Sequence, residues 1–375
     1  MSIWNRSNYS LKYLSDVFYS KETEEIESNF SRDQLFKKFY EFEKLELKNT
    51  IKNFEDMLND DTDIVLLEKD MIRCKYALKA TFNEYFMLDF INKNDDERTW
   101  YITNWYRHRY FNFLNELFYQ KFYSDKYKTY KKYKKFYKRE MILIKNSSDF
   151  DIFKNFINKH SIVIKKPYNR SLGIWIEIIK KSAINKHLFK KYLKESWKFV
   201  LEELIQQSDE MAILHPESVN TVRIYGYIDD NNNIITCFPF IKMWVWNSIV
   251  DNWWAGGIIA AVDSSGVVTT DWIDELWNKY KVHPDTKIKI KGFKLPDWNT
   301  AINIVKSASW MNKYTRLIWR DLAYTKEGWV IVEWNWKWHF LWQIAMQKWM
   351  KNDFEKMIHR DSVENKQQYV FWSRK

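Results

Sequence analysis

Residues 316–335, RLIWRDLAYTKEGWVIVEWN, contain two apolar, β-branched runs on either side of a turn at Thr325–Gly328. If this turn closes an antiparallel hairpin, positions whose numbers sum to about 654 lie opposite each other, so Asp321 faces Glu333. Asn335 projects to the same face as Glu333, because side chains alternate along a strand. Two carboxylates and an amide oxygen are ligands that suit Mg²⁺. The same spacing also fits an exposed acidic pair that holds no metal.

A lysine-containing segment lies upstream, at residues 161–175, SIVIKKPYNRSLGIW. It predicts a strand that ends in Lys165, Lys166 and Pro167, followed by a polar loop with Gly173. A lysine at this place can put its ammonium on a phosphate while loop N–H groups close over the others. The segment lacks the GxxxxGK[ST] pattern of a P-loop. An ordinary lysine at a strand end is the alternative.

A third segment, SVNTVRIYGY at residues 218–227, carries Asn220 and Arg223 into a predicted strand. An arginine that faces a nucleotide suits the charge that develops in phosphoryl transfer. Further along, VDNWWAGGIIAAVD at residues 250–263 predicts a turn-rich loop that presents Asp251 and Asn252 before another strand.

The pattern of apolar residues changes near Arg139. Residues 33–122 show apolar side chains at three- and four-residue spacings, which predicts a helical N-terminal region. Beyond Arg139, short β-branched runs alternate with helical patterns at about 149–158, 186–196 and 297–310. Strands mixed with a few helices predict an α+β domain rather than a regular succession of βαβ units.

Residues 121–139 contain nine Lys or Arg against one Asp, with tyrosines three or four residues apart. This spacing places the tyrosines on one face of a helix and the lysines around it. We expect the tyrosine face to pack on a neighbouring element. Base stacking on nucleic acid is the alternative.

Composition excludes several classes of protein. With 46% hydrophobic and 18% aromatic residues the chain has material for a large core. It shows no apolar run long enough for a membrane helix and no apolar leader at the N-terminus, so we expect a cytoplasmic protein. Cys74 and Cys237 are too few for a disulfide framework. The net charge of +11 allows a polyanionic partner, but the abundance of Lys, Asn, Ile, Phe and Tyr also fits A/T-rich codon usage.

Taken in order, these segments resemble the ATP-grasp superfamily, and in particular the sugar-transfer-associated ATP-grasp proteins. The resemblance covers about residues 121–345 and includes FVLEELIQQ at 199–207, VHPDT at 282–286 and KGFKLPDW at 291–298. It implies an ATP-grasp fold, in which two α+β subdomains grip the nucleotide. We therefore expect a helical region at 1–120, the ATP-grasp domain at 121–360 and a tail at 361–375.

The resemblance also implies site residues. For nucleotide binding they are Lys166, Gly173, Trp175, Glu202 and Asn220; for catalysis Arg223 and Lys242; for the metal Asp321, Glu333 and Asn335. ATP and Mg²⁺, or Mn²⁺ in its place, are the expected cofactors. Lys242 stands where the family tends to have arginine.

The implied activity is that of a carboxylate–amine or carboxylate–thiol ligase that works through an acyl phosphate, in a pathway that decorates cell-surface or capsular polysaccharide. Its expected partners are ATP and a small or glycan-linked carboxylate or amine, with no membrane span. One alternative is a phosphotransferase that acts on a sugar hydroxyl. Another, from a different class, is a basic nucleic-acid-binding protein, which we regard as the weaker expectation.

Glycine and tryptophan occur in unusual numbers, with 7 Gly and 21 Trp in 375 residues. Several Trp stand where the family pattern has Gly, namely Trp175, Trp244, Trp246, Trp319, Trp334 and Trp336. One interpretation is an aromatic-rich protein. Our hypothesis is that some of these residues are glycine in the living protein, because its source decodes UGA as glycine. Trp334 alternates with Glu333 and Asn335, so we expect its side chain in the core on the opposite face of the hairpin.

Overall fold

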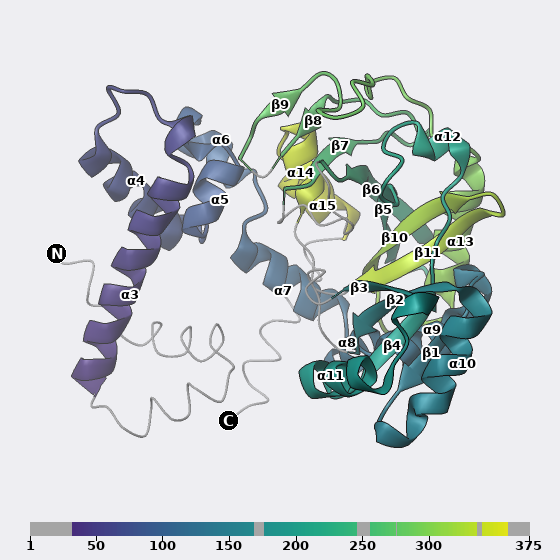
Figure 1. Ribbon diagram of the computed structural model, residues 1–375. Helices are drawn as coiled ribbons and strands as arrows, with labels where there is room; N and C mark the ends of the chain where they lie inside the picture. The colour runs from purple at the N-terminus through teal and green to yellow at the C-terminus, as the bar shows by residue number, and fades with distance from the viewer. Residues whose placement is uncertain (1–31, 169–175, 246–255, 275, 336–339, 359–375) are drawn as a thin grey trace. The chain divides into compact units, whose positions relative to one another are not determined.

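The computed structural model describes residues 32–168, 176–245, 256–274, 276–335 and 340–358 (Figure 1). The chain divides into two compact units, Met1–Ile72 and Arg73–Lys375. The described part of the first unit contains helix α3 (Arg32–Asn53), the short helix η2 (Glu55–Met57) and the beginning of α4 (Ile64–Ala77).

The second unit begins with helices. They are α5 (Phe82–Met87), η3 (Phe90–Asn92), α6 (Asp95–Thr99), α7 (Asn104–Leu114), α8 (Leu117–Ser124) and α9 (Lys126–Tyr137). Capping boxes start two of them, with Thr81 and Glu84 at α5 and with Asn94 and Glu97 at α6. The expected helical N-terminal region is thus confirmed.

A four-stranded antiparallel sheet follows. Its strands are β1 (Met141–Ile144), β2 (Ile162–Pro167), β3 (Glu177–Lys180) and β4 (Phe199–Glu203), in the order β1-β4-β2-β3. Helices α10 (Phe150–His160) and α11 (Lys186–Ser196) pack on the sheet, and the short helices η4 (Ser147–Asp149) and η5 (Lys181–Ala183) precede them. Phe153, Phe189 and Phe199 lie at the centre of this small core.

The larger sheet has seven antiparallel strands in the order β11-β10-β5-β6-β7-β8-β9 (Figure 1). Their bounds are β5 (Thr221–Ile228), β6 (Ile234–Met243), β7 (Ile258–Ala261), β8 (Trp272–Ile273), β9 (Lys279–Tyr280), β10 (Leu317–Thr325) and β11 (Gly328–Asn335). The remaining helices are α12 (Asp209–Ala212), α13 (Trp298–Trp310), α14 (Leu341–Met346) and α15 (Lys351–Met357). Helix α13 packs on β5 and β6, which buries Ala301, Val305 and Ala308. Two sheets with helices against them confirm the expected α+β class.

The hairpin of residues 316–335 has the predicted register. Strands β10 and β11 pair antiparallel, with Thr325 opposite Gly328 and Asp321 opposite Glu333. A bulge interrupts the ladder between Asp321 and Leu322. The bulge adds one residue to β11, so the opposed numbers sum to 653 near the turn and to 654 at the acidic pair.

The tyrosine face of α9 packs in the core, as expected. Tyr130, Tyr133 and Tyr137 are buried, while the lysines on the other side of the helix, such as Lys131 and Lys134, are exposed. These three rings are therefore not available to stack on bases, which removes the main support for a nucleic-acid-binding function.

Candidate active site

One cavity brings together predicted site residues from both sheets. Lys166 comes from β2, Glu202 from β4 and Glu333 from β11, and all three line it. Its empty volume, counted out to open solvent, is about 470 Å³.

A buried ion network holds the two sheets together at this cavity. Glu202 accepts hydrogen bonds from Lys166 Nζ at 2.9 Å and from Arg139 Nη2 at 3.0 Å. Arg139 also donates to the carbonyls of Ile331 and Val332 on β11. Burial alone raises the pKa of Glu202, but Lys166 and Arg139 outweigh it and hold the pKa below its usual value. Glu202 is therefore a buried carboxylate with two cations against it.

Helix α9 adds a residue that the sequence analysis missed. Lys126, at its first turn, lines the same cavity as Lys166 and Glu333. Burial lowers the pKa of Lys126, and Glu333 opposes the shift. Its position inside a Lys/Tyr-rich helix concealed it, because nothing in that run distinguishes one lysine from the next. Arg139 was missed as well, since it belongs to no motif.

A row of charged side chains crosses three neighbouring strands. In the ladders Arg223 on β5 lies opposite Asp321 on β10, which lies opposite Glu333 on β11. Arg223 Nε and Nη2 donate to the two carboxylate oxygens of Asp321 at 2.8 and 2.9 Å. Lys242 Nζ on β6 donates to Asp321 at 2.9 Å. The structure thus brings both predicted catalytic residues to one of the predicted metal ligands.

The charge on Asp321 is set by these neighbours. Burial raises the pKa of Asp321, but Arg223 and Lys242 outweigh it, so the pKa lies below its usual value. The side chains of Arg223, Lys242 and Asp321 are 11%, 6% and 5% exposed. An aromatic ring covers the arginine, because the guanidinium carbon of Arg223 lies 3.4 Å from the centre of the Trp319 ring.

Asn220 has a different environment from the other predicted nucleotide-binding residues. It is fully buried, and its amide nitrogen donates to Gln207 Oε1 and to the carbonyls of Met211 and His215. The side chain thereby holds the segment between β4 and β5. A contact of Asn220 with nucleotide remains a prediction.

Several predicted positions cannot be placed. Gly173, Trp175, Asp251, Asn252, Trp246 and Trp336 lie outside the described residues. Asn335 ends β11 opposite Trp319, and its side chain also lies outside the described part.

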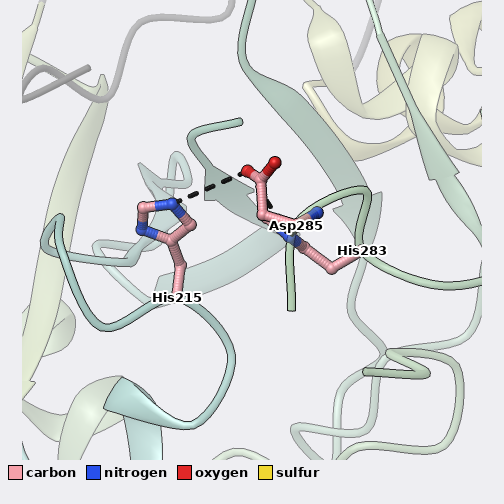
Figure 2. A group of neighbouring side chains, drawn as sticks. All are labelled: His215, His283 and Asp285. Carbon is pink, nitrogen blue, oxygen red and sulfur yellow. Dashed lines mark hydrogen bonds and ion pairs between the residues drawn. The ribbon is translucent and has the colours of Figure 1, made fainter. Parts of the chain in front are cut away.

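Two histidines far apart in the sequence lie close to Asp285, as Figure 2 shows. His215 Nε2 and His283 Nδ1 lie 3.9 and 4.0 Å from Asp285 Oδ2. His283 Nδ1 already accepts the backbone N–H groups of Asp285 and Thr286, and its Nε2 lies 2.9 Å from the carbonyl of Trp244. These bonds hold the 283–286 turn against the end of β6, which favours a structural role for His283. His215 Nδ1 lies 3.0 Å from Ser218 Oγ, which favours a structural role for it as well.

With this geometry established, known proteins can be compared. The sequence model of the family described as sugar-transfer associated ATP-grasp matches residues 106–358. The chain belongs to this family, as the sequence resemblance implied. The match begins within α7, upstream of the boundary expected at residue 120. Family membership agrees with the expectation of an ATP-grasp enzyme.

Solved structures give more distant matches. D-alanyl-alanine synthetase A from Vibrio cholerae O1 is 10% identical, with a TM-score of 0.36, over 57% of this chain and 55% of that one. The ATP-grasp ligase PsnB complexed with minimal precursor is 12% identical, with a TM-score of 0.38, over 66% and 60%. D-alanine–D-alanine ligase from Bacillus anthracis is 10% identical, with a TM-score of 0.38, over 68% and 70%.

The chain therefore spans less than two thirds of the first two of these structures, at 55% and 60% of their lengths. No curated protein sequence matches the chain. Among the helices in the described part, none is long and apolar enough to span a bilayer.

Proposed function

We propose that the protein is an ATP- and Mg²⁺-dependent ligase that joins a carboxylate to an amine or a thiol. The observation that supports it most is the row Arg223–Asp321–Glu333 across three adjacent strands, with Lys166 in the cavity that Glu333 lines. Phosphoryl transfer needs cations and metal-binding carboxylates around the same small volume. This arrangement supplies both from rigid strands.

The chemistry would proceed in two balanced steps. A carboxylate oxygen of the substrate attacks the γ-phosphorus of ATP, the bond to the β-phosphate oxygen breaks, and ADP leaves. The acceptor amine or thiol then attacks the acyl carbon, phosphate leaves, and the acceptor loses a proton. Arg223, Lys242 and Lys166 would neutralise phosphate charge, and no protein nucleophile is needed.

The donor atoms present suit Mg²⁺. Asp321 and Glu333 offer hard carboxylate oxygens on one sheet face, and Mg²⁺ prefers such ligands together with water and phosphates. Bound there, the metal would neutralise the charge of the transferred phosphate. Asp321 is already paired with Arg223 and Lys242, so those two cations must share the carboxylate or move to the phosphate when the site fills.

Two finer points belong to the proposal. The family description connects these proteins with sugar transfer, and we extend it to a role in cell-surface or capsular polysaccharide synthesis, with a glycan-linked acceptor. We also propose a cytoplasmic location, where ATP is available. A sugar kinase would use the same cations and metal and is the second candidate.

The test is product analysis of the purified protein with Mg-ATP and panels of carboxylates, amines, thiols and sugars. A ligase yields ADP, free phosphate and a condensed product, and hydroxylamine traps its acyl phosphate as a hydroxamate. A kinase yields a phosphorylated acceptor instead. Lys166→Ala and Glu333→Gln should abolish turnover, while the exposed controls Lys134→Ala and Glu327→Gln should retain it. Equal activity in all four variants would refute the assignment of the site.

A further inference from the structure

Two tryptophans have backbone conformations that favour glycine. Trp277 has φ of +69°, and Trp197 has φ of +61° with ψ of −52°. A bulky residue with positive φ is a genuine outlier, because its Cβ crowds the neighbouring carbonyl. Neither residue was among the positions singled out in the sequence, so the structure adds them independently.

The turn that contains Trp277 occurs three times among the residues that the structure describes. Each turn begins with an aspartate, namely Asp229, Asp263 or Asp274. The side chain of the aspartate accepts a hydrogen bond from the backbone N–H four positions later. Its backbone carbonyl accepts a hydrogen bond from the N–H three positions later. The residue three positions after the aspartate is left-handed each time. It is Asn232 in the first turn, Gly266 in the second and Trp277 in the third. Asn and Gly are the residues that this position normally selects.

Trp197 occupies the position after helix α11, where left-handed glycine commonly ends a helix. Its N–H donates to the carbonyl of Leu193, and the next N–H, of Lys198, donates back to Ser196 at 2.5 Å. This closes a positive-φ γ-turn around Trp197, which is rare and strained. The indole is 83% exposed, so packing does not compensate for the strain.

The buried indoles divide into two groups. Trp298 donates its N–H to Ser264 O at 2.9 Å, and Trp329 donates to Pro296 O at 2.9 Å. By contrast, the buried indole N–H groups of Trp244, Trp272, Trp277, Trp319 and Trp342 have no acceptor in the described part of the chain. A buried indole N–H normally finds a partner, because leaving it unpaired is costly. The hydrogen bonds of the first group are those expected of buried tryptophans.

Two more tryptophans occupy space at the proposed active site. Trp319 lies two residues before Asp321, on the same sheet face, and its ring covers Arg223 at 3.4 Å. Trp334 lines the cavity with Lys166, and its ring stacks 4.0 Å from that of Tyr133. Glycine at 319 would uncover the arginine, and glycine at 334 would remove a core ring that also lines the cavity.

We infer that five tryptophans are glycine in the protein as its source makes it, whereas Trp298 and Trp329 are genuine tryptophans. Trp197 and Trp277 are inferred from their backbone conformation. Trp244, Trp319 and Trp334 are inferred because they stand where the family pattern has glycine, and the first two also have buried indole N–H groups that are unpaired among the described residues. Decoding of UGA as glycine produces this pattern, because translation with a code that reads UGA as tryptophan, rather than as stop, inserts tryptophan at glycine positions. It also accounts for the low glycine and high tryptophan content. The inference rests on backbone conformation, indole bonding and the family glycine pattern, so it stands or falls separately from the proposed ligase activity.

The decisive test reads the codons in the gene and the masses of peptides from the protein purified from its source. We expect UGA and glycine at the five positions, and UGG and tryptophan at 298 and 329. UGG, or tryptophan in the native peptides, at 197 or 277 would overturn the inference. Glycine at 298 or 329 would also overturn it, because indole bonding would then not distinguish the two groups.

A second test uses the chain expressed with tryptophan at all these positions. Trp277→Gly and Trp197→Gly should each raise the urea midpoint, and Trp329→Gly should lower it. Asn232→Trp is the matched control, because it places tryptophan at the left-handed position of an equivalent turn. It should lower the midpoint. If Trp277→Gly lowers the midpoint or leaves it unchanged, the conformational argument is wrong. A Trp319→Gly, Trp334→Gly double variant should bind Mg-ATP more tightly than its parent by calorimetry; no gain would show that these indoles do not block the site.

Discussion

Glu202→Gln should destabilise the protein far more than its small change in shape indicates. The carboxylate is 2% exposed and accepts hydrogen bonds from Arg139 Nε at 3.2 Å, Arg139 Nη2 at 3.0 Å and Lys166 Nζ at 2.9 Å. The side chains of Arg139 and Lys166 are only 5% and 12% exposed. Without the negative charge both cations stay buried and uncompensated. Breaking a buried ion pair in this way costs about 3–5 kcal/mol.

A control for this change lies on a neighbouring strand end. Glu140 also has two basic partners, Lys159 at 2.6 Å and His160 at 2.9 Å, but its side chain is 46% exposed. Solvent screens such pairs, so Glu140→Gln should cost only ~0–1 kcal/mol. Both carboxylates have two basic partners, so a difference in the loss of unfolding free energy between the two variants reports the effect of burial.

The assay is urea unfolding followed by circular dichroism, at neutral and acidic pH. The folded-state pKa of Glu202 is lowered, so its contribution is present above the ordinary carboxyl pKa and is lost as pH falls through the folded value. The difference between the parent and Glu202→Gln should therefore shrink in acid. A loss at neutral pH no larger than that of Glu140→Gln, or a difference that grows in acid, would refute the reasoning.

Three other predictions concern single positions. Gly226→Ala should cost ~1–3 kcal/mol by urea unfolding, because a Cβ there would lie 2.4 Å from Ser309 Oγ and 2.8 Å from Arg320 Nη1; an unchanged midpoint would contradict it. Burial lowers the pKa of His283 below its usual value of 6.5. The unfolded chain therefore binds the proton more readily, and the free energy of unfolding should fall as the pH drops from about 7 to about 5. His283→Gln should make this pH dependence less steep, and an unchanged slope would contradict the prediction. Lys126→Ala should weaken Mg-ATP binding in calorimetry by at least tenfold, as expected on losing a charge-assisted contact of ~1.5 kcal/mol or more, whereas Lys134→Ala on the exposed face of α9 should not.

Local patterns were sufficient for the hairpin and the helix faces. The turn at Thr325–Gly328 and the alternation of side chains predicted that Asp321 faces Glu333, because a short hairpin leaves few registers open. The tyrosine spacing predicted the buried face of α9 for the same reason, since the helical period alone decides which residues share a side. Trp334 likewise lies in the core, as alternation with Glu333 required.

Tertiary structure alone decided which charges meet. Arg139 and Glu202 are 63 residues apart, and Arg223 and Asp321 are 98 apart. Nothing in the local sequence states that strands β1 and β4, or β5 and β10, come together in this way. The family resemblance named Arg223, Lys242 and Asp321 as site residues, but only the fold shows that they form one ion cluster. Lys126 joined the cavity because α9 packs on β11, a contact that its lysine-rich sequence does not encode locally.

For the tryptophans too, the sequence and the tertiary structure supplied different information. Sequence composition and the family pattern raised the question of their identity, because both depend only on which residues stand where. Trp197 and Trp277 became informative only when their φ angles were known. Trp298 and Trp329 were separated from the others only by the carbonyls that their indoles reach. Backbone conformation and hydrogen-bond partners arise from the packed chain, so a sequence by itself carries neither.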